Sequence, residues 1–139
     1  MKRIHAVAAI VALLLLGVSL ASGQQEGAAA GSPEVWGGPH VSLVMSSENA
    51  TFEFDCAQGV ITTPIKPDAS GNFSAAGTYT PQRGGPVFKN NPPRDLPATY
   101  KGTIQGNTMH LEVLLADKEQ QPPPMTLTRG EAGRVVKCR

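Results

Sequence analysis

The sequence predicts an all-β protein: a single antiparallel up-and-down β-barrel of about eight strands, preceded by a signal peptide. Three observations support this prediction. After residue 34, apolar and polar side chains alternate with a period of two, and turn residues interrupt the alternation at short intervals. No segment after the signal has the period of an amphipathic helix. Consecutive hairpins of this kind favour a meander that closes on itself.

The N-terminus has the parts of a cleavable signal peptide. Lys2 and Arg3 give it a basic start, residues 6–20 carry no charge, and small side chains precede a cut after Gly23. The uncharged run is shorter than the roughly 20 residues of a membrane-spanning helix. We therefore expect residues 1–23 to be removed on export to the periplasm or the medium, with no stable membrane span left in the mature chain. Residues 24–34 are small, polar and glycine-rich, which predicts a disordered leader before a domain at 35–139.

The mature chain has 116 residues, enough for one domain. Its ten lysines and arginines face eleven acidic residues, so the charge gives no support to a nucleic-acid partner or to binding at a membrane surface. Cys56 and Cys138 are its only cysteines. Two thiols in one small exported domain usually pair, so we expect a structural disulfide between them.

The first half of the domain predicts strands at 41–45, 52–56, 60–65 and 73–79. The domain starts at Val35 and Trp36, and Gly37, Gly38 and Pro39 are expected to form a turn. In the second predicted strand, Cys56 falls on the apolar face with two phenylalanines, so we expect its side chain to be buried.

The second half predicts strands at 98–105, 109–115, 125–128 and 134–138, with Cys138 on the apolar side of the last one. A bond from Cys56 to Cys138 would then join the second strand to the last, near the seam of a closed barrel. Between Pro81 and Pro97 lies a loop of 17 residues that includes five prolines. Loops of this length are usually functional or disordered.

Two short motifs carry a resemblance. Residues 36–40 (WGGPH) and 127–130 (LTRG) resemble the start and end of small secreted bacterial β-barrel proteins of an uncharacterised family, over most of residues 35–138. Residues 71–79 (GNFSAAGTY) are loosely similar to a glycine-turn strand of barrels with an avidin or lipocalin layout. The resemblance implies a barrel and no assigned activity. An avidin pocket needs several tryptophans and this chain has only Trp36, so biotin binding is not implied.

No pattern of residues identifies an enzyme. His40 and His110 fall on the polar sides of their strands, and the chain has no HxH, HExxH, CxxC or GxSxG spacing. Glu53 and Asp55 share one outward face instead of facing each other across a cleft, as the carboxylates of a glycosidase do. We therefore expect no catalytic residue, no metal and no cofactor.

Two features remain as candidates for binding. An eight-stranded barrel is either filled by its own side chains or holds one small ligand. Its predicted interior comprises Trp36, Phe52, Phe54, Phe73, Tyr79, Tyr100, Met109 and Leu111. The second candidate is the long loop, which carries Arg83, Val87, Phe88, Lys89 and Arg94.

The expected function is that of an exported, non-enzymatic β-barrel that binds a small apolar ligand or a partner protein. Two alternatives stay open. One is a secreted protein that resembles a protease inhibitor and acts through residues 83–96. The other is a structural protein of the cell envelope.

Overall fold

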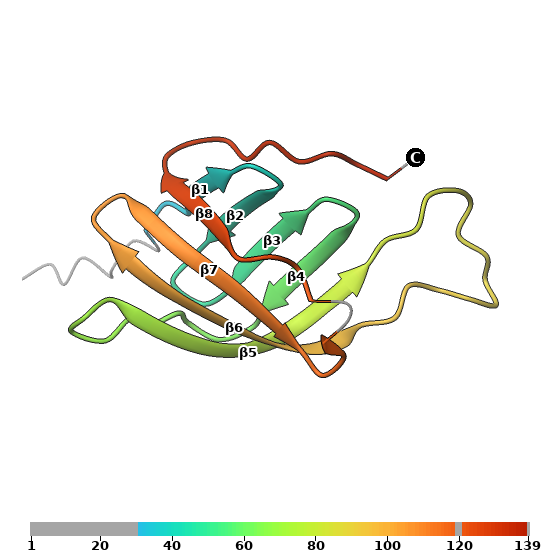
Figure 1. Cartoon of the computed structure of the whole chain (residues 1–139), viewed down its shortest axis with the longest axis horizontal. Helices are drawn as coiled ribbons and strands as arrows, with labels where there is room; N and C mark the ends of the chain where they lie inside the picture. The colour runs from blue at the N-terminus through green and yellow to red at the C-terminus, as the bar shows by residue number, and fades with distance from the viewer. Residues whose placement is uncertain (1–30, 119–120, 139) are drawn as a thin grey trace, which may run out of the picture.

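The computed structural model describes residues 31–118 and 121–138, so the predicted signal peptide and most of the predicted leader lie outside it. The described chain forms one closed antiparallel barrel in which the strands follow one another in sequence order (Figure 1). This confirms the predicted all-β barrel. The strands are β1 (Glu34–Gly38), β2 (Val41–Met45), β3 (Ala50–Phe54), β4 (Ala57–Ile61), β5 (Asn72–Pro81), β6 (Leu96–Gln105), β7 (Thr108–Leu115) and β8 (Met125–Arg129). In the described ranges, no helix is long and apolar enough to cross a membrane.

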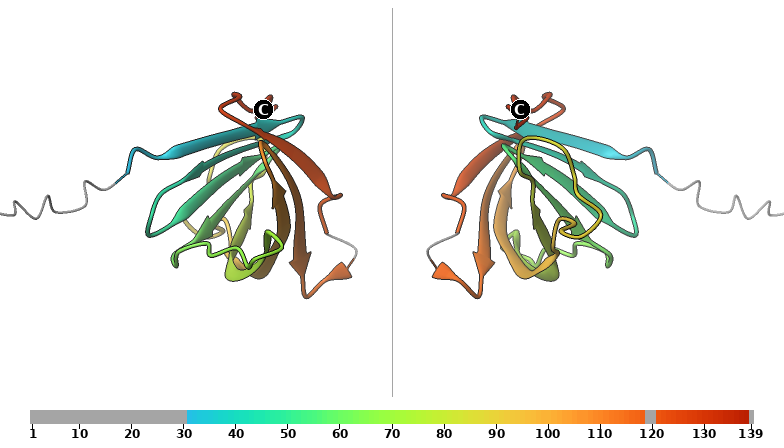
Figure 2. Two further views of the ribbon diagram at one scale, coloured as in Figure 1. Left: turned by 90° about the vertical axis from the view of Figure 1, so that its left-hand side faces the viewer. Right: turned by 90° about the vertical axis from the view of Figure 1, so that its right-hand side faces the viewer.

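The barrel closes where β8 returns to β1. Trp36 lies opposite Arg129 and Gly37 opposite Thr128, whereas β1 and β2 pair along five residues each. The two end-on views in Figure 2 show the sheet curling until its first and last strands meet. Closure satisfies the backbone groups that an open sheet would expose along its edges.

The period of two places every second side chain in the barrel interior. Along β7, for example, Met109, Leu111 and Val113 are buried, while His110 and Glu112 point to solvent. The buried core of the described chain consists of apolar and aromatic side chains, with no charged residue among them. Such a core excludes water and provides the main driving force for folding.

The predicted turn at residues 37–39 and the last predicted strand are wrong. Gly37 and Gly38 were expected in a turn but are buried within β1, and the turn consists of Pro39 and His40. Residues 134–138 were expected to form the last strand but form only one isolated parallel bridge, between Pro39 and Arg134. The reason is that β8 already occupies the edge of β1, which leaves little of that edge for the C-terminal segment.

The predicted burial of Cys56 is also wrong. β3 ends at Phe54, and Cys56 lies in the turn to β4, where its φ of 56° is left-handed and its side chain is half-buried. Cys138 is likewise half-buried, in the segment after β8. The two cysteines form the expected disulfide, with their Cα atoms 4.9 Å apart. The bond therefore joins a turn to the C-terminal segment, not one strand to another.

Candidate functional site

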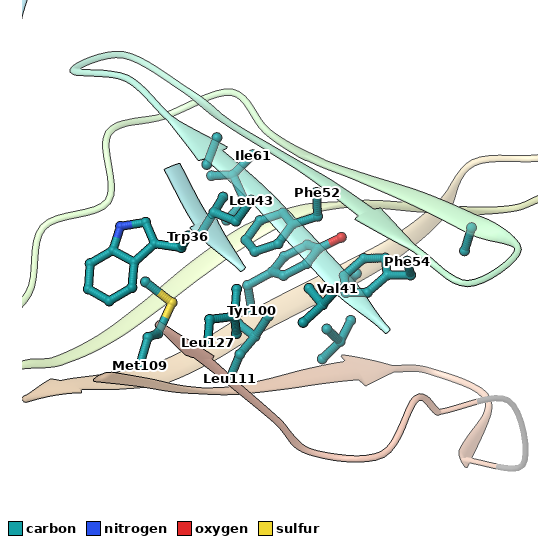
Figure 3. Close-up of a cluster of buried hydrophobic side chains, with 14 of the residues drawn as sticks. Trp36, Val41, Leu43, Phe52, Phe54, Ile61, Tyr100, Met109, Leu111 and Leu127 are labelled. Carbon is teal, nitrogen blue, oxygen red and sulfur yellow. The ribbon is translucent and has the colours of Figure 1, made fainter. Parts of the chain in front are cut away.

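The structure brings the residues of the predicted interior site together inside the barrel. Figure 3 shows Trp36, Phe52, Phe54, Tyr100, Met109 and Leu111 among them. Seven of the eight are buried, and Tyr79 is half-buried beside them. They come from β1, β3, β5, β6 and β7, so strand pairing alone positions them.

Aromatic rings fill the middle of this interior. The ring of Phe52 stacks on that of Tyr100 with centroids 4.7 Å apart and on that of Phe54 at 5.7 Å. The ring of Phe54 in turn contacts that of Tyr79 at 5.4 Å. A Cβ atom at Gly59 would overlap the Tyr100 hydroxyl, so the wall and its contents fit closely here. These side chains pack against one another in the part of the barrel where a small apolar ligand was expected.

The polar group of Tyr100 is satisfied inside the protein. Its hydroxyl donates a hydrogen bond to the Thr78 carbonyl at 2.7 Å. Burial raises the pKa of Tyr100 far above its ordinary value, with a further contribution from the neighbouring Tyr79. This hydroxyl therefore acts as a structural hydrogen-bond donor inside the barrel.

Trp36 helps to close the barrel. Its indole N–H donates to Glu34 Oε2 at 3.2 Å, and the guanidinium of Arg129 lies 4.4 Å from its ring centroid. Arg129 also forms an ion pair with Glu34 at 2.8 Å. The three side chains link β1 to β8, which assigns Trp36 a structural role at the seam.

The second predicted site lies in residues 82–95, which connect β5 to β6 and project away from the barrel (Figure 1). We call this segment the β5–β6 loop. Val87 is 70% exposed and Phe88 is 68% exposed, which makes them the most exposed large apolar side chains of the described chain. Apolar side chains held in solvent like this mark interaction sites when they are grouped.

Hydrogen bonds fix both ends of the β5–β6 loop. The Gln82 N–H donates to the Cys56 carbonyl at 2.7 Å, which continues the pairing of β5 with β4 by one residue. Asp95 accepts a hydrogen bond from the Thr80 hydroxyl at 2.5 Å. At the tip, the Asn91 N–H donates to the Phe88 carbonyl at 3.0 Å and closes a turn. The loop therefore rises from a fixed base to a turned tip.

Three cations lie in the same loop as Val87 and Phe88. Arg83, Lys89 and Arg94 are all exposed. Two ion pairs of the described residues, those of His40 with Asp55 and of Arg129 with Glu34, lie outside the loop. The loop thus presents two apolar side chains with positive charge on either side.

Beside the base of the loop lies a contact that the sequence did not reveal. Asp55 was expected on an outward, solvated face of a strand, but it lies in the turn between β3 and β4. Its Oδ2 contacts His40 Nδ1 at 2.5 Å, and its Oδ1 accepts the Val136 N–H at 2.6 Å. The Val136 hydrogen bond lowers the pKa of Asp55 below its ordinary value, and His40 lowers it further by hydrogen bonding and charge, against partial desolvation.

His40 and His110 lie at separate places on the surface of the barrel. His110 lies on the outer wall, with its Nδ1 3.2 Å from the Thr126 hydroxyl. His40 pairs with Asp55 at the surface, and the buried core of the described residues contains no serine or cysteine. Throughout residues 31–118 and 121–138, no group of three His, Cys, Asp or Glu side chains is arranged to hold a metal ion.

Comparison with known proteins adds no candidate. No family model, no curated protein and no solved structure matches the chain. The candidate site therefore depends on the geometry alone, and in the described residues the β5–β6 loop carries the most exposed large apolar side chains.

Proposed function

We propose that this chain is an exported, non-enzymatic binding module that holds a partner protein with the β5–β6 loop. One observation carries the proposal: Val87 and Phe88 lie side by side at the end of a projecting loop, each about two-thirds exposed. A buried Val or Phe side chain contributes about 1.5–3 kcal/mol relative to an exposed one. A partner that covers both side chains recovers this free energy.

The shape of the loop supports the same proposal. Its base is fixed by the Gln82 and Asp95 hydrogen bonds, and it contains Pro86, Pro92 and Pro93. Proline restricts the backbone before binding, so less conformational entropy is lost when a partner binds. The barrel below serves as the rigid support for such a loop.

The charges of the loop indicate the chemistry of the partner. A surface that fits Arg83, Lys89 and Arg94 carries carboxylates around an apolar pocket for Phe88. Aromatic residues and arginine are enriched at protein interfaces, and complementary charge raises the rate and the specificity of association.

Export is part of the proposal. The Cys56–Cys138 disulfide supports it, because such bonds persist in oxidising compartments. The basic and apolar start of the sequence supports it as well.

A substrate-like protease inhibitor is less well supported than a docking loop. Such an inhibitor presents an extended segment that pairs with the protease as an added strand. Here the Asn91 N–H to Phe88 carbonyl bond folds the tip into a turn. The tip is a knob that fits a pocket better than it fits a strand-binding cleft.

Site-specific photocrosslinking in the native host tests the proposal. A photoreactive phenylalanine analogue replaces Phe88 in one variant and Ser74, which is exposed on the outer wall of β5, in the control. We expect illumination to give one discrete protein adduct at position 88 and none at position 74. In the Phe88 probe variant, Arg83→Glu together with Arg94→Glu should reduce that adduct, since it reverses charge at both ends of the loop.

Two results would reject the proposal. One is the absence of any protein adduct at position 88 from cells in which the protein is expressed normally. The other is equal labelling of many proteins at positions 74 and 88, which would point to a general envelope role without a specific partner.

A further inference from the structure

The C-terminal segment crosses the outside of the barrel next to the β5–β6 loop. We call residues 131–138 the C-terminal strap. A Cβ atom at Gly37 would overlap the strap backbone, and a Cβ atom at Gly133 would overlap the Val41 carbonyl and the Ser42 side chain. The strap therefore lies directly on β1 and β2, as the end-on views show (Figure 2). Glycine at position 37 leaves the room for this crossing.

Backbone and side-chain contacts fix the strap to two neighbouring turns. The Arg134 N–H donates to the Gly38 carbonyl at 3.0 Å, and the His40 N–H donates to the Arg134 carbonyl at 2.8 Å. Two residues further on, the Val136 N–H donates to Asp55 at 2.6 Å. The disulfide then attaches Cys138 to the residue that follows Asp55.

The strap holds both of the non-glycine residues with positive φ in the described chain. His40 has a φ of 65° and Cys56 a φ of 56°, and each lies in a turn at this end of the barrel. The left-handed region is unfavourable for residues with a Cβ atom and persists where surrounding contacts impose it. The hydrogen bond from His40 to Arg134 and the bond from Cys56 to Cys138 are such contacts.

Cys56 also belongs to the base of the β5–β6 loop. The Gln82 N–H, the first amide of that loop, donates to the carbonyl of Cys56 itself. The turn that the disulfide holds is therefore the turn that holds the loop. Cys138 is therefore connected to the first amide of the loop through a single residue, Cys56.

We propose that the Cys56–Cys138 bond is a redox latch for the β5–β6 loop, an inference that builds on the proposed function of that loop. When the bond is intact, Cys56 is held in its left-handed conformation and its carbonyl anchors Gln82. When the bond is reduced, the end of the strap is released, Cys56 relaxes, and the base of the loop becomes mobile. The partner then binds a loop that has to be ordered first, so its affinity falls.

The chemistry of the switch is thiol–disulfide exchange with a dithiol reductant. One reductant thiolate attacks a sulfur of the pair and forms a mixed disulfide, and the second reductant thiol resolves it. The reductant loses two electrons and two protons and becomes a disulfide, and Cys56 and Cys138 each end as a thiol. Both cysteines are half-buried and not enclosed in the core, which leaves the bond open to this attack.

Amide hydrogen exchange measured by NMR on the mature protein tests the latch without any partner. The probe is the Gln82 amide, which is bonded to Cys56 at 2.7 Å. The matched control is the Ile104 amide, which donates to the Gly71 carbonyl at 2.8 Å in another loop contact away from the disulfide. After reduction with dithiothreitol, we expect exchange at Gln82 to accelerate by at least about tenfold, and exchange at Ile104 by less than about twofold.

The double variant Cys56→Ser with Cys138→Ser should reproduce the reduced pattern. If that variant fails to fold, the oxidised wild-type protein is reduced after folding and gives the same comparison. Equal acceleration at both amides would mean general destabilisation, and no change at Gln82 would mean that the loop base is independent of the disulfide. Either result overturns the latch.

These outcomes are separate from those of the crosslinking experiment. If the reduced protein forms the Phe88 adduct in the same yield as the oxidised protein, the latch is rejected and the proposed function stays intact. Faster exchange at Gln82 without any adduct at Phe88 supports the latch geometry and rejects the proposed function.

Discussion

Two phenylalanine truncations measure how completely the barrel is filled. Phe52 is 0% exposed and Phe88 is 68% exposed, so Phe52→Ala and Phe88→Ala make the same chemical change in opposite surroundings. Removing the Phe52 ring loses the free energy gained by burying it, about 1.5–3 kcal/mol. Its stacking on Tyr100 and on Phe54 adds about 0.5–1.5 kcal/mol for each pair.

The expected loss of unfolding free energy for Phe52→Ala is therefore about 3–5 kcal/mol, the usual range for Phe→Ala in a packed core. Phe88→Ala should change the unfolding free energy by less than about 0.5 kcal/mol. Urea unfolding, followed by the fluorescence of the single buried tryptophan, Trp36, measures both values. An unchanged slope against urea concentration shows that both variants unfold as the wild type does.

A loss below about 1.5 kcal/mol for Phe52→Ala would refute the reasoning, because a ring that faces a packed core leaves a costly cavity behind. Such a small loss would mean that the ring borders a space already open to solvent or to a ligand. A loss above about 1 kcal/mol for Phe88→Ala would contradict the exposed position of the loop tip.

Three further predictions concern the core, the Asp55 contact and the strap. Tyr100→Phe should cost about 1–2 kcal/mol at neutral pH by removing the donor to the Thr78 carbonyl. Because burial raises the pKa of Tyr100 above its ordinary value of 10.0, its stabilisation is complete below that pH and is lost as the pH rises further, so the variant should flatten the alkaline side of a stability profile. The pKa of Asp55 is lowered from 3.8, so the stabilisation that Asp55 provides is present above that pH and is lost as the pH falls below it. Asp55→Asn should therefore flatten the acid side of the same stability profile. An unchanged acid side would contradict the hydrogen bond from Val136 of the strap to Asp55. Gly37→Ala should destabilise the fold by about 1–3 kcal/mol because its methyl group meets the strap, while Gly31→Ala, which meets nothing, should have no effect in the same urea assay.

The barrel was predictable where side chains alone specify a strand. Met109, Leu111, Val113 and Leu115 alternate with polar or less buried neighbours, and all four are buried in β7 as the alternation predicts. A shift of one residue would turn the whole set to solvent, so the pattern fixes both the strand and its face.

The ends of the barrel were not predictable in the same way. Gly37 and Gly38 have no side chain to mark a face, so the sequence predicts a turn there. The structural reason for glycine at position 37 is the strap, whose residues come almost a hundred positions later. Val136 and Cys138 alternate as in a strand, but a strand also needs a free partner edge, which local sequence does not report.

The candidate site likewise has a part that the sequence predicts and a part that it does not. The β5–β6 loop could be predicted from its prolines, its length and its flanking strands, because these properties are local. The contacts of Asp55 with His40 and with Val136 join residues 15 and 81 positions apart, and no spacing or motif marks them. Non-local contacts of this kind follow from the closure of the barrel, so they appear only once the fold is known.

Native mass spectrometry of the mature protein, purified gently from its own host, tests the central claim most directly. If the barrel is filled and the β5–β6 loop is the binding site, the spectrum should contain the bare chain and a complex heavier by the mass of one protein. That complex should disappear in the double variant Val87→Ala with Phe88→Ala. A chain that instead carries a small releasable molecule, and keeps it in this variant, would contradict the account and place the binding site inside the barrel.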